Sequence, residues 1–270
     1  MNKRIGFIGV GNMGSAIIGG ILNSELVKGK DITAGDMSTS SLEKLKEKYG
    51  VNITKDNKVV VENSDIVFLS VKPHIYKTVI DEIKDIVDES KLIVTIAAGQ
   101  SIENIENMFG KSIRLVRTMP NTPALVMEGM GLICPNENAT DEDVDDVINI
   151  FNSFGKSERV DESLIDTAGS LSGCGPAYVY MFIEALADAA VESGVGRDMA
   201  YKLAAQMVMG SAKMVLETGE HPGKLKDAVC SPGGTTIKGV NSLEYSGFRG
   251  IVIDALLESI NKTLEMSGKK

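Results

Sequence analysis

Cysteine is scarce in this chain of 270 residues, which holds only Cys134, Cys174 and Cys230. The number is odd, and no two of these residues have the spacing of a metal-ligand pair. Neither a disulfide framework nor a zinc site is therefore expected. We interpret the three residues as reduced thiols of a cytoplasmic protein, each behaving as a small buried hydrophobic side chain.

Basic residues are also fewer than acidic ones. The chain has 28 Lys and Arg against 37 Asp and Glu, which gives a formal net charge of −9. An acidic surface argues against nucleic acid as a partner, because that binding needs Lys and Arg to displace phosphate counterions. Small anionic ligands remain compatible with this charge, since local backbone N–H groups can hold them. The expected partners therefore include small molecules but no nucleic acid.

Long uninterrupted hydrophobic runs are missing. The uncharged stretch over residues 5–24, preceded by Lys3 and Arg4, resembles a signal peptide, but six glycines and Asn12 interrupt it. No A-x-A cleavage site follows, so a strand, a turn and a helix explain the stretch better. No other segment qualifies as a membrane span, and low-complexity linkers and internal repeats are missing as well. We expect a cytoplasmic protein that does not enter a membrane.

Short apolar runs alternate with amphipathic segments up to about residue 160. The run I-V-F-L-S-V over 66–71 is typical of a strand buried on both faces of a parallel sheet. Strands that alternate with helices predict an α/β fold with a Rossmann-like, doubly wound sheet. The expected strands are Arg4–Ile8, Asp31–Ala34, Asp65–Val71, Lys91–Ile96 and Ile113–Arg117, and the expected helices among them include Asn12–Asn23 and Ser40–Tyr49.

The pattern changes near residue 164, so we place a domain boundary between an α/β domain over 1–163 and an all-helical domain over 164–270. Helices are expected over Ser172–Glu192, Asp198–Glu217 and Leu243–Met266, with Gly247 and Gly250 as candidate breaks in the last. These helices are apolar around more than one face, which requires burial on all sides. A dimer or larger homo-oligomer would supply that burial, and a compact monomeric bundle is the alternative.

The first strand leads into the pattern G-x-G-x-x-G, formed by Gly9, Gly11 and Gly14 with Asn12 and Met13 between them. The position between a strand and a helix is the context that supports a dinucleotide-binding turn. The first glycine permits the tight turn, the second lets the backbone approach a pyrophosphate, and the third allows close packing of helix and strand. The helix N-terminus then offers its N–H groups to the anion.

Asp36 follows the second strand, about 20 residues after the third glycine. An acidic side chain at this point can accept hydrogen bonds from the adenosine ribose and favours NAD(H). Ser38, Thr39 and Ser40, with Lys44 near them, could instead hold the 2′-phosphate of NADP(H), and Asp36 could simply cap the next helix. The sequence leaves the choice between NADP(H) and NAD(H) open.

Three further segments follow expected strands and so belong at the ligand-binding edge of the sheet. They are Ser70–His74, Ala97–Gly99 and Thr118–Pro123. Small and proline-fixed residues there suit a rigid wall against a flat nicotinamide ring. Lys72 could meet a phosphate or carboxylate or be a solvated surface lysine, and His74 is interpreted as an exposed histidine. Candidate cofactor-binding residues from these segments are Val71, Lys72, Pro73, Ala97 and Asn121.

A second glycine-rich loop, Cys230–Thr236, precedes a helical stretch in the C-terminal region. Its two glycines allow successive backbone N–H groups to point the same way, which creates an anion-binding nest. Ser and Thr at a helix start add hydroxyl donors and caps. The loop therefore suits one small carboxylate and a neighbouring polar atom, although a plain capped turn has the same spacing.

Several strings together resemble the pyrroline-5-carboxylate reductase family over nearly the whole chain. The most specific is S-P-G-G-T-T over 231–236, followed by G-F-R over 247–249. Cys174 stands where a serine is common in the family, and Asp36 stands where a neutral polar residue is more usual. The other matching strings are Val71–Pro73, Met119–Pro123, Ser172–Tyr178, His221–Asp227 and Val229–Ile237.

The resemblance implies a Rossmann dinucleotide-binding domain, a helical dimerisation and substrate-binding domain, and the NAD(P)H-dependent reduction of L-1-pyrroline-5-carboxylate to L-proline, the last step of proline biosynthesis. It implies a homo-oligomer, either a dimer or a ring of dimers, with active sites between protomers. We interpret Thr236 as the catalytic residue, which hydrogen-bonds the imine nitrogen. The implied substrate-binding residues are Ser231, Gly233, Gly234, Thr235 and Thr236.

Two other classes share parts of this pattern. A β-hydroxyacid dehydrogenase has the same two-domain plan, but it places a catalytic Lys before an Asn on a long helix, and the segment Ser172–Glu192 contains neither. A non-catalytic dinucleotide sensor would act through its oligomer interface and would not need the loop over 231–236. Cofactor binding without imine-dependent oxidation would favour the sensor.

Overall fold

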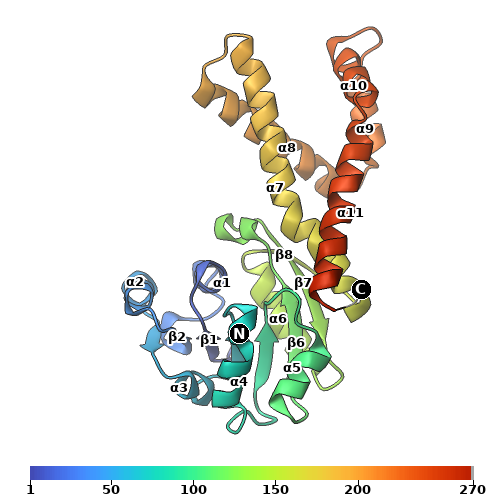
Figure 1. The fold of residues 1–270 in the computed structure, drawn as a ribbon. Helices are drawn as coiled ribbons and strands as arrows, with labels where there is room; N and C mark the ends of the chain where they lie inside the picture. The colour runs from blue at the N-terminus through green and yellow to red at the C-terminus, as the bar shows by residue number, and fades with distance from the viewer. Residues whose placement is uncertain (269–270) are drawn as a thin grey trace. The chain divides into compact units, whose positions relative to one another are not determined.

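The computed structural model describes residues 1–268, and the chain divides into two compact units (Figure 1). The first unit comprises Met1–Gly173 together with the end of the chain from Ser259, and the second comprises Cys174–Glu258. The boundary predicted from the sequence, between residues 163 and 164, lies near the start of helix α7 (Glu162–Glu192) and stays a prediction.

One sheet of eight strands forms the centre of the first unit, in the order β3-β2-β1-β4-β5-β6-β7-β8. All neighbouring strands are parallel except β6 and β7, which run antiparallel. The first six strands have the order of a dinucleotide-binding Rossmann sheet, which confirms the predicted α/β class. The strands are β1 (Ile5–Ile8), β2 (Ile32–Gly35), β3 (Asn52–Thr54), β4 (Ile66–Leu69), β5 (Leu92–Thr95), β6 (Arg114–Met119), β7 (Gly129–Pro135) and β8 (Gly155–Arg159).

Alternate residues of the central strands enter two separate hydrophobic cores, one on each face of the sheet. In β4, Phe68 enters the first core and stacks on Phe7 at 4.8 Å between ring centroids, whereas Val67 and Leu69 enter the second. This burial on both faces is why the strands read as continuous apolar runs. The first core is covered by α1 (Asn12–Asn23), α2 (Thr39–Tyr49) and α6 (Asp141–Asn152), and the second by α3 (Asn57–Glu62), α4 (Tyr76–Ile83), α5 (Ile102–Phe109) and the start of α7.

The carboxyl ends of β1, β2, β4 and β5 lie at one edge of the sheet. In the registers, Ile8 is opposite both Gly35 and Leu69, and Leu69 is opposite Thr95. The residues that follow these four strands therefore emerge side by side, where ligands of open α/β sheets bind.

Three strands and the first part of helix α7 are among the elements that the sequence did not single out. β3 is short, β8 (G-K-S-E-R) is polar and largely exposed, and β7 carries two glycines, so each lacks the apolar pattern of a central strand. Helix α7 begins ten residues before the predicted start at Ser172. The predicted break at Gly247 is confirmed, since this residue has φ +75° between two helices, but Gly250 lies within the last helix.

The second unit is built only from helices in its described residues. Tyr178 donates a hydrogen bond of 3.2 Å to the Ala255 carbonyl, and the rings of Phe182 and Phe248 lie 6.2 Å apart. The helices that contribute to it are α7, α8 (Arg197–Thr218), α9 (Pro222–Ala228), α10 (Thr235–Tyr245) and α11 (Phe248–Met266).

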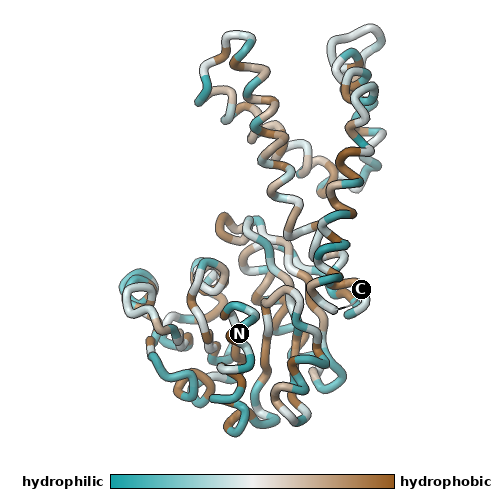
Figure 2. The backbone as a smooth tube through the Cα atoms, in the orientation of Figure 1, coloured by the Kyte–Doolittle hydropathy of each residue, from teal (hydrophilic) through white to brown (hydrophobic). Residues whose placement is uncertain are grey.

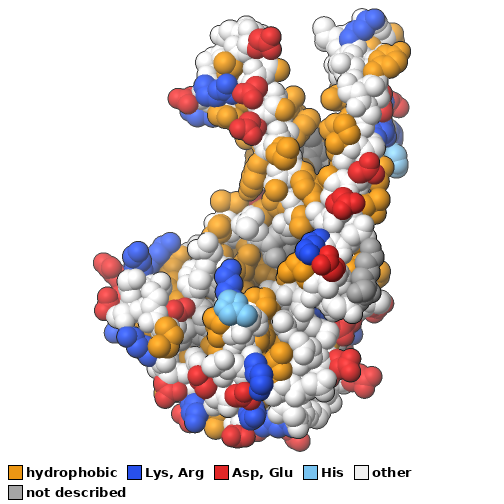
Figure 3. Space-filling model, in the orientation of Figure 1, with side chains coloured by type: hydrophobic (Ala, Val, Ile, Leu, Met, Phe, Trp, Pro, Cys, Tyr) orange, Lys and Arg blue, Asp and Glu red, His pale blue; other side chains and the backbone are white. Residues whose placement is uncertain are grey.

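The second unit has few buried apolar side chains by itself. Its buried hydrophobic residues are three alanines, Ala187, Ala200 and Ala204. Hydrophobic residues recur along α7, α8 and α11 (Figure 2), and orange side chains lie exposed on these helices (Figure 3). Leu216 is 81% exposed and Tyr245 93% exposed. A unit without a large buried side chain needs a partner surface to be stable, which supports the predicted oligomer.

Candidate active site

The three glycines of the first turn meet different surroundings. Gly9 has φ +95°, and a Cβ there would lie 2.8 Å from the Ser70 carbonyl oxygen, so the turn requires glycine. A Cβ on Gly14 would lie 2.7 Å from the Gly9 carbonyl oxygen, whereas a Cβ on Gly11 would have no neighbour within 4 Å. Gly9 and Gly14 thus serve the fold, and Gly11 leaves open space at the start of α1.

That open space belongs to a cavity of about 820 Å³ in the first unit. Gly11 is the N-cap of α1, and no side chain among the described residues caps this helix end. Its first N–H groups are therefore available to an anion such as a pyrophosphate. The cavity is lined by Ile8, Gly9, Gly11, Asn12, Met13, Gly35, Asp36, Met37, Asn57, Ser70, Val71, Lys72, Pro73, Ile75, Val79, Ile96, Ala97, Ala98 and Pro120.

Nine of the eleven residues predicted to bind the cofactor line this cavity, and two do not. Gly14 packs beneath the turn against Gly9. Asn121 is buried, its amide donates to the Ser172 carbonyl at 3.0 Å, and its oxygen accepts from the Met130 N–H at 2.8 Å. The nine are Gly9, Gly11, Asn12, Met13, Asp36, Val71, Lys72, Pro73 and Ala97.

Asp36 joins two backbone segments at the end of β2. Its Oδ2 accepts from the Val10 N–H and its Oδ1 from the Ser38 N–H, both at 2.8 Å. Ser38, and not Asp36, is the N-cap of α2, because the Ser38 hydroxyl accepts from the Ser41 N–H. The alternative that Asp36 merely caps this helix is therefore wrong.

Lys72 and His74, which follow β4, are both exposed, as the sequence allowed. Lys72 is exposed at the cavity wall and precedes a short 3-10 helix over Pro73–Ile75. His74 is also exposed and does not line the cavity, which confirms its interpretation as a solvent-facing histidine.

Some cavity residues were not predicted as site residues. Ser70 supports the glycine turn, since its hydroxyl donates to the Gly9 carbonyl at 2.6 Å. Asn57 begins α3, a helix that the sequence pattern did not single out, and Pro120 comes from the turn after β6. The sequence placed Ser70 and Pro120 at the ligand-binding edge, within Ser70–His74 and Thr118–Pro123, but did not name them as site residues.

The second glycine-rich loop lies in the helical unit, between α9 and α10. Gly233 has φ +71°, a conformation that L side chains rarely adopt, and the Gly234 N–H donates to the Ser231 carbonyl at 3.0 Å. Gly234 is the N-cap of α10 and no described side chain caps that helix. Thr235 and Thr236 are exposed in its first turn. The loop therefore offers free backbone N–H groups at a helix start and exposed hydroxyl groups, and both can donate hydrogen bonds to a small carboxylate.

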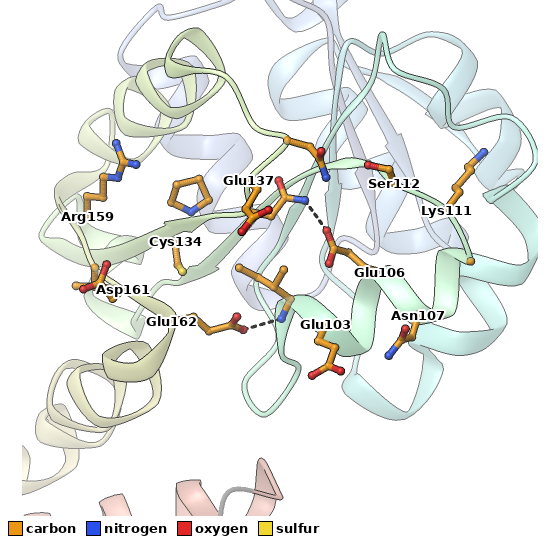
Figure 4. Close-up of a pocket in the computed structure, with 16 residues that line it drawn as sticks. Glu103, Glu106, Asn107, Lys111, Ser112, Cys134, Glu137, Arg159, Asp161 and Glu162 are labelled. Carbon is orange, nitrogen blue, oxygen red and sulfur yellow. Dashed lines mark hydrogen bonds between the residues drawn. The ribbon is translucent and has the colours of Figure 1, made fainter.

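Another cavity of the first unit, of about 890 Å³, contains none of the predicted site residues (Figure 4). Its carboxylates are partly engaged: Glu162 accepts from the Ile102 N–H at 2.6 Å, and Glu106 accepts from Asn136 at 2.7 Å. Burial raises the pKa of Cys134 in its wall to about 11, so this residue is a thiol at neutral pH. Five carboxylates against two cations line it, which disfavours the phosphates of a dinucleotide.

The described residues, 1–268, provide two further observations. They contain no group of three or more His, Cys, Asp or Glu side chains that could hold a metal ion. No helix among them is both long and apolar enough to span a bilayer.

The three cysteines are free, as expected. Cys134 is buried as predicted, whereas Cys174 and Cys230 are only partly buried.

The Rossmann strand order, the open Gly11 and the cavity at the strand ends define a dinucleotide-binding protein. Two family models match: pyrroline-5-carboxylate reductase dimerisation over residues 162–266, and NADP oxidoreductase, coenzyme F420-dependent, over residues 4–99. The chain belongs to the pyrroline-5-carboxylate reductase family.

Relatives match over nearly the whole chain. The pyrroline-5-carboxylate reductase of Escherichia coli is 48% identical, with 99% of each chain covered. The solved structure of a pyrroline-5-carboxylate reductase from Coxiella burnetii has a TM-score of 0.94 at 37% identity, with 99% of each chain covered. The crystal structure of the Plasmodium falciparum pyrroline carboxylate reductase with NADP bound has a TM-score of 0.88 at 37% identity, with 98% of each chain covered.

Proposed function

We propose that this protein reduces L-1-pyrroline-5-carboxylate to L-proline with a reduced nicotinamide dinucleotide, the last step of proline biosynthesis. The observation that carries the proposal is the presence, in one chain of this family, of the cavity around Gly11 and the exposed loop over 231–236. The first suits a dinucleotide, and the second suits the carboxylate of a small cyclic imine acid.

The Rossmann unit binds and orients the cofactor. The N-terminus of α1 holds the pyrophosphate, Asp36 meets the adenosine ribose, and the residues after β4 and β5 enclose the nicotinamide end. Val71, Pro73 and Ala97 supply a small, rigid wall there. When bound, the reduced dinucleotide supplies the hydride that adds to C5 of the imine.

The loop of the helical unit positions the substrate. Backbone N–H groups around Gly233 and Gly234, with Ser231 and Thr235, hold the carboxylate, and the Thr236 hydroxyl hydrogen-bonds the ring nitrogen. A cyclic imine can take its proton from solvent, so the protein needs no strong acid at this point. The main contribution of the chain is to hold two rings face to face.

The oligomer completes the site in this proposal. The loop over 231–236 from one protomer meets the dinucleotide cavity of its partner, in a dimer or a ring of dimers. The exposed apolar surface of the second unit supports close association of two copies. We place the enzyme in the cytoplasm, where its free cysteines remain reduced.

The test is the loss of dihydronicotinamide absorbance when pyrroline-5-carboxylate is added, in parallel with NADPH and NADH. Oxidation that depends on the imine and yields proline is expected. A folded protein that binds either cofactor without oxidising it would contradict the proposal and favour a dinucleotide sensor. Binding measured on the same preparation separates that result from loss of the fold.

A further inference from the structure

The Asp36 carboxylate is fixed in place at the wall of the dinucleotide cavity. Its two oxygens accept from the N–H groups of two separate segments, Val10 in the glycine turn and Ser38 before α2. The carboxylate can rotate away only if both hydrogen bonds break. Each oxygen still has a lone pair for another donor.

No positive side chain balances this carboxylate inside the cavity. Among the lining residues, Asp36 and Lys72 are the charged ones. They follow β2 and β4, which lie on opposite sides of β1, so two strand spacings, roughly 10 Å, separate their backbones. The lysine is therefore placed for the other end of a bound dinucleotide.

Several other polar groups near Asp36 are engaged elsewhere. The Ser38 hydroxyl caps α2 and also shares hydrogen bonds with the hydroxyls of Ser40 and Ser41, at 3.3 and 3.0 Å. The amide of Asn57 donates to Glu82 at 2.7 Å, which brings a second carboxylate to this side. Lys44 lines a different hollow, between α1 and α2, to which Asp36 does not contribute.

We propose that the fixed Asp36 carboxylate makes this chain select NADH over NADPH. Its free lone pairs accept from the 2′- and 3′-hydroxyls of the adenosine ribose, whereas a 2′-phosphate would place its negative charges against a carboxylate that cannot move away. The inference rests on the proposed function only in that the cavity holds a nicotinamide dinucleotide.

The experiment compares the affinities of NADH and NADPH by titration calorimetry, with no imine present. We expect wild-type protein to bind NADH at least about tenfold more tightly than NADPH. Asp36→Ser removes the charge, and Asp36→Asn keeps an oxygen that can accept from Val10. In both variants the ratio of the two affinities should fall by about tenfold or more. Glu82→Gln is the matched control, because it removes a nearby carboxylate outside the cavity and should leave the ratio within about twofold.

Equal or tighter binding of NADPH by wild-type protein would overturn the inference. An unchanged ratio of the NADH and NADPH affinities in both Asp36 variants would overturn it as well. A disturbed glycine turn would weaken the binding of both cofactors equally, whereas loss of the charge repulsion would favour the binding of NADPH. The two proposals fail separately: better imine reduction with NADPH would leave the function intact and remove the selectivity. Selective NADH binding without imine reduction would leave the selectivity intact and remove the proposed function.

Discussion

The side-chain amide of Asn121 donates a hydrogen bond of 3.0 Å to the carbonyl oxygen of Ser172 in α7. Pro176 lies four residues further along this helix and has no N–H with which to close the usual helical hydrogen bond to that carbonyl. The Asn121 oxygen also accepts from the Met130 N–H in β7. One buried side chain thus connects the turn after β6, the neighbouring strand and the proline-containing helix.

Asn121→Ala should lower the free energy of unfolding by about 1–3 kcal/mol, because it leaves buried backbone groups without partners. Urea denaturation at a fixed protein concentration measures the change. In a Pro176→Ala background the loss should be smaller, since a backbone N–H can then reach the Ser172 carbonyl. Equal losses in the two backgrounds would show that Asn121 does not substitute for the hydrogen bond that proline omits.

Gly11→Ala and Gly14→Ala should separate ligand binding from folding. An added Cβ at Gly11 meets nothing within 4 Å, and φ of −63° is ordinary for alanine, so the fold should keep its stability. The methyl group enters the space expected for the pyrophosphate and should weaken NADH binding by about tenfold or more. Gly14→Ala places a Cβ 2.7 Å from the Gly9 carbonyl oxygen and should cost about 1–3 kcal/mol of stability.

Thermal denaturation and NADH titration of the two glycine variants provide the comparison. Normal NADH affinity in Gly11→Ala would mean that the cavity does not hold the pyrophosphate as described. Wild-type stability in Gly14→Ala would contradict the close packing of α1 on the turn.

Thr236→Ala should lower kcat by about tenfold to a thousandfold, the range expected for one positioned polar group. The side chain is exposed in the first turn of α10, so its removal should leave the circular dichroism spectrum unchanged. Thr236→Ser keeps the hydroxyl and serves as the matched control, with most of the turnover retained. Unchanged turnover in the alanine variant would remove Thr236 from the mechanism.

The stability of this protein should depend on its concentration. The second unit holds only three buried hydrophobic residues, all alanines, so unfolding must be linked to dissociation of the oligomer. The urea midpoint should rise as protein concentration is raised a hundredfold, with sedimentation velocity reporting the assembly at each concentration. A midpoint independent of concentration, with a monomer in solution, would contradict the account of this surface.

Buried apolar runs made much of the first unit predictable. The strands after Arg4, Asp65 and Lys91 lie where the sequence placed them. These strands are covered on both faces of the sheet, so residues such as Phe68 and Val94 belong to continuous apolar runs. The polar β8 lacks that signal because an edge strand does not need an apolar face, and in the interior strand β7 two glycines interrupt the apolar run.

The composition of the site was more predictable than its internal contacts. Glycine spacing indicated the turn, and strand ends indicated Val71 and Ala97. The hydrogen bond from Val10 to Asp36 joins residues 26 positions apart and depends on the β1–β2 register, which no local pattern encodes. The hydrogen bond from the Asn121 amide to the Ser172 carbonyl likewise depends on the position of Pro176 in α7, which leaves that carbonyl without its helical partner.

Transfer of hydride to the imine carbon is the central claim, and isotope labelling tests it most directly. The protein is incubated with pyrroline-5-carboxylate and NADH deuterated at C4 of the reduced ring, separately for each face, and the product is analysed by mass spectrometry and NMR. The account predicts proline with one deuterium at C5, from one of the two labelled cofactors only. Absence of proline, or proline formed without deuterium from either cofactor, would contradict it.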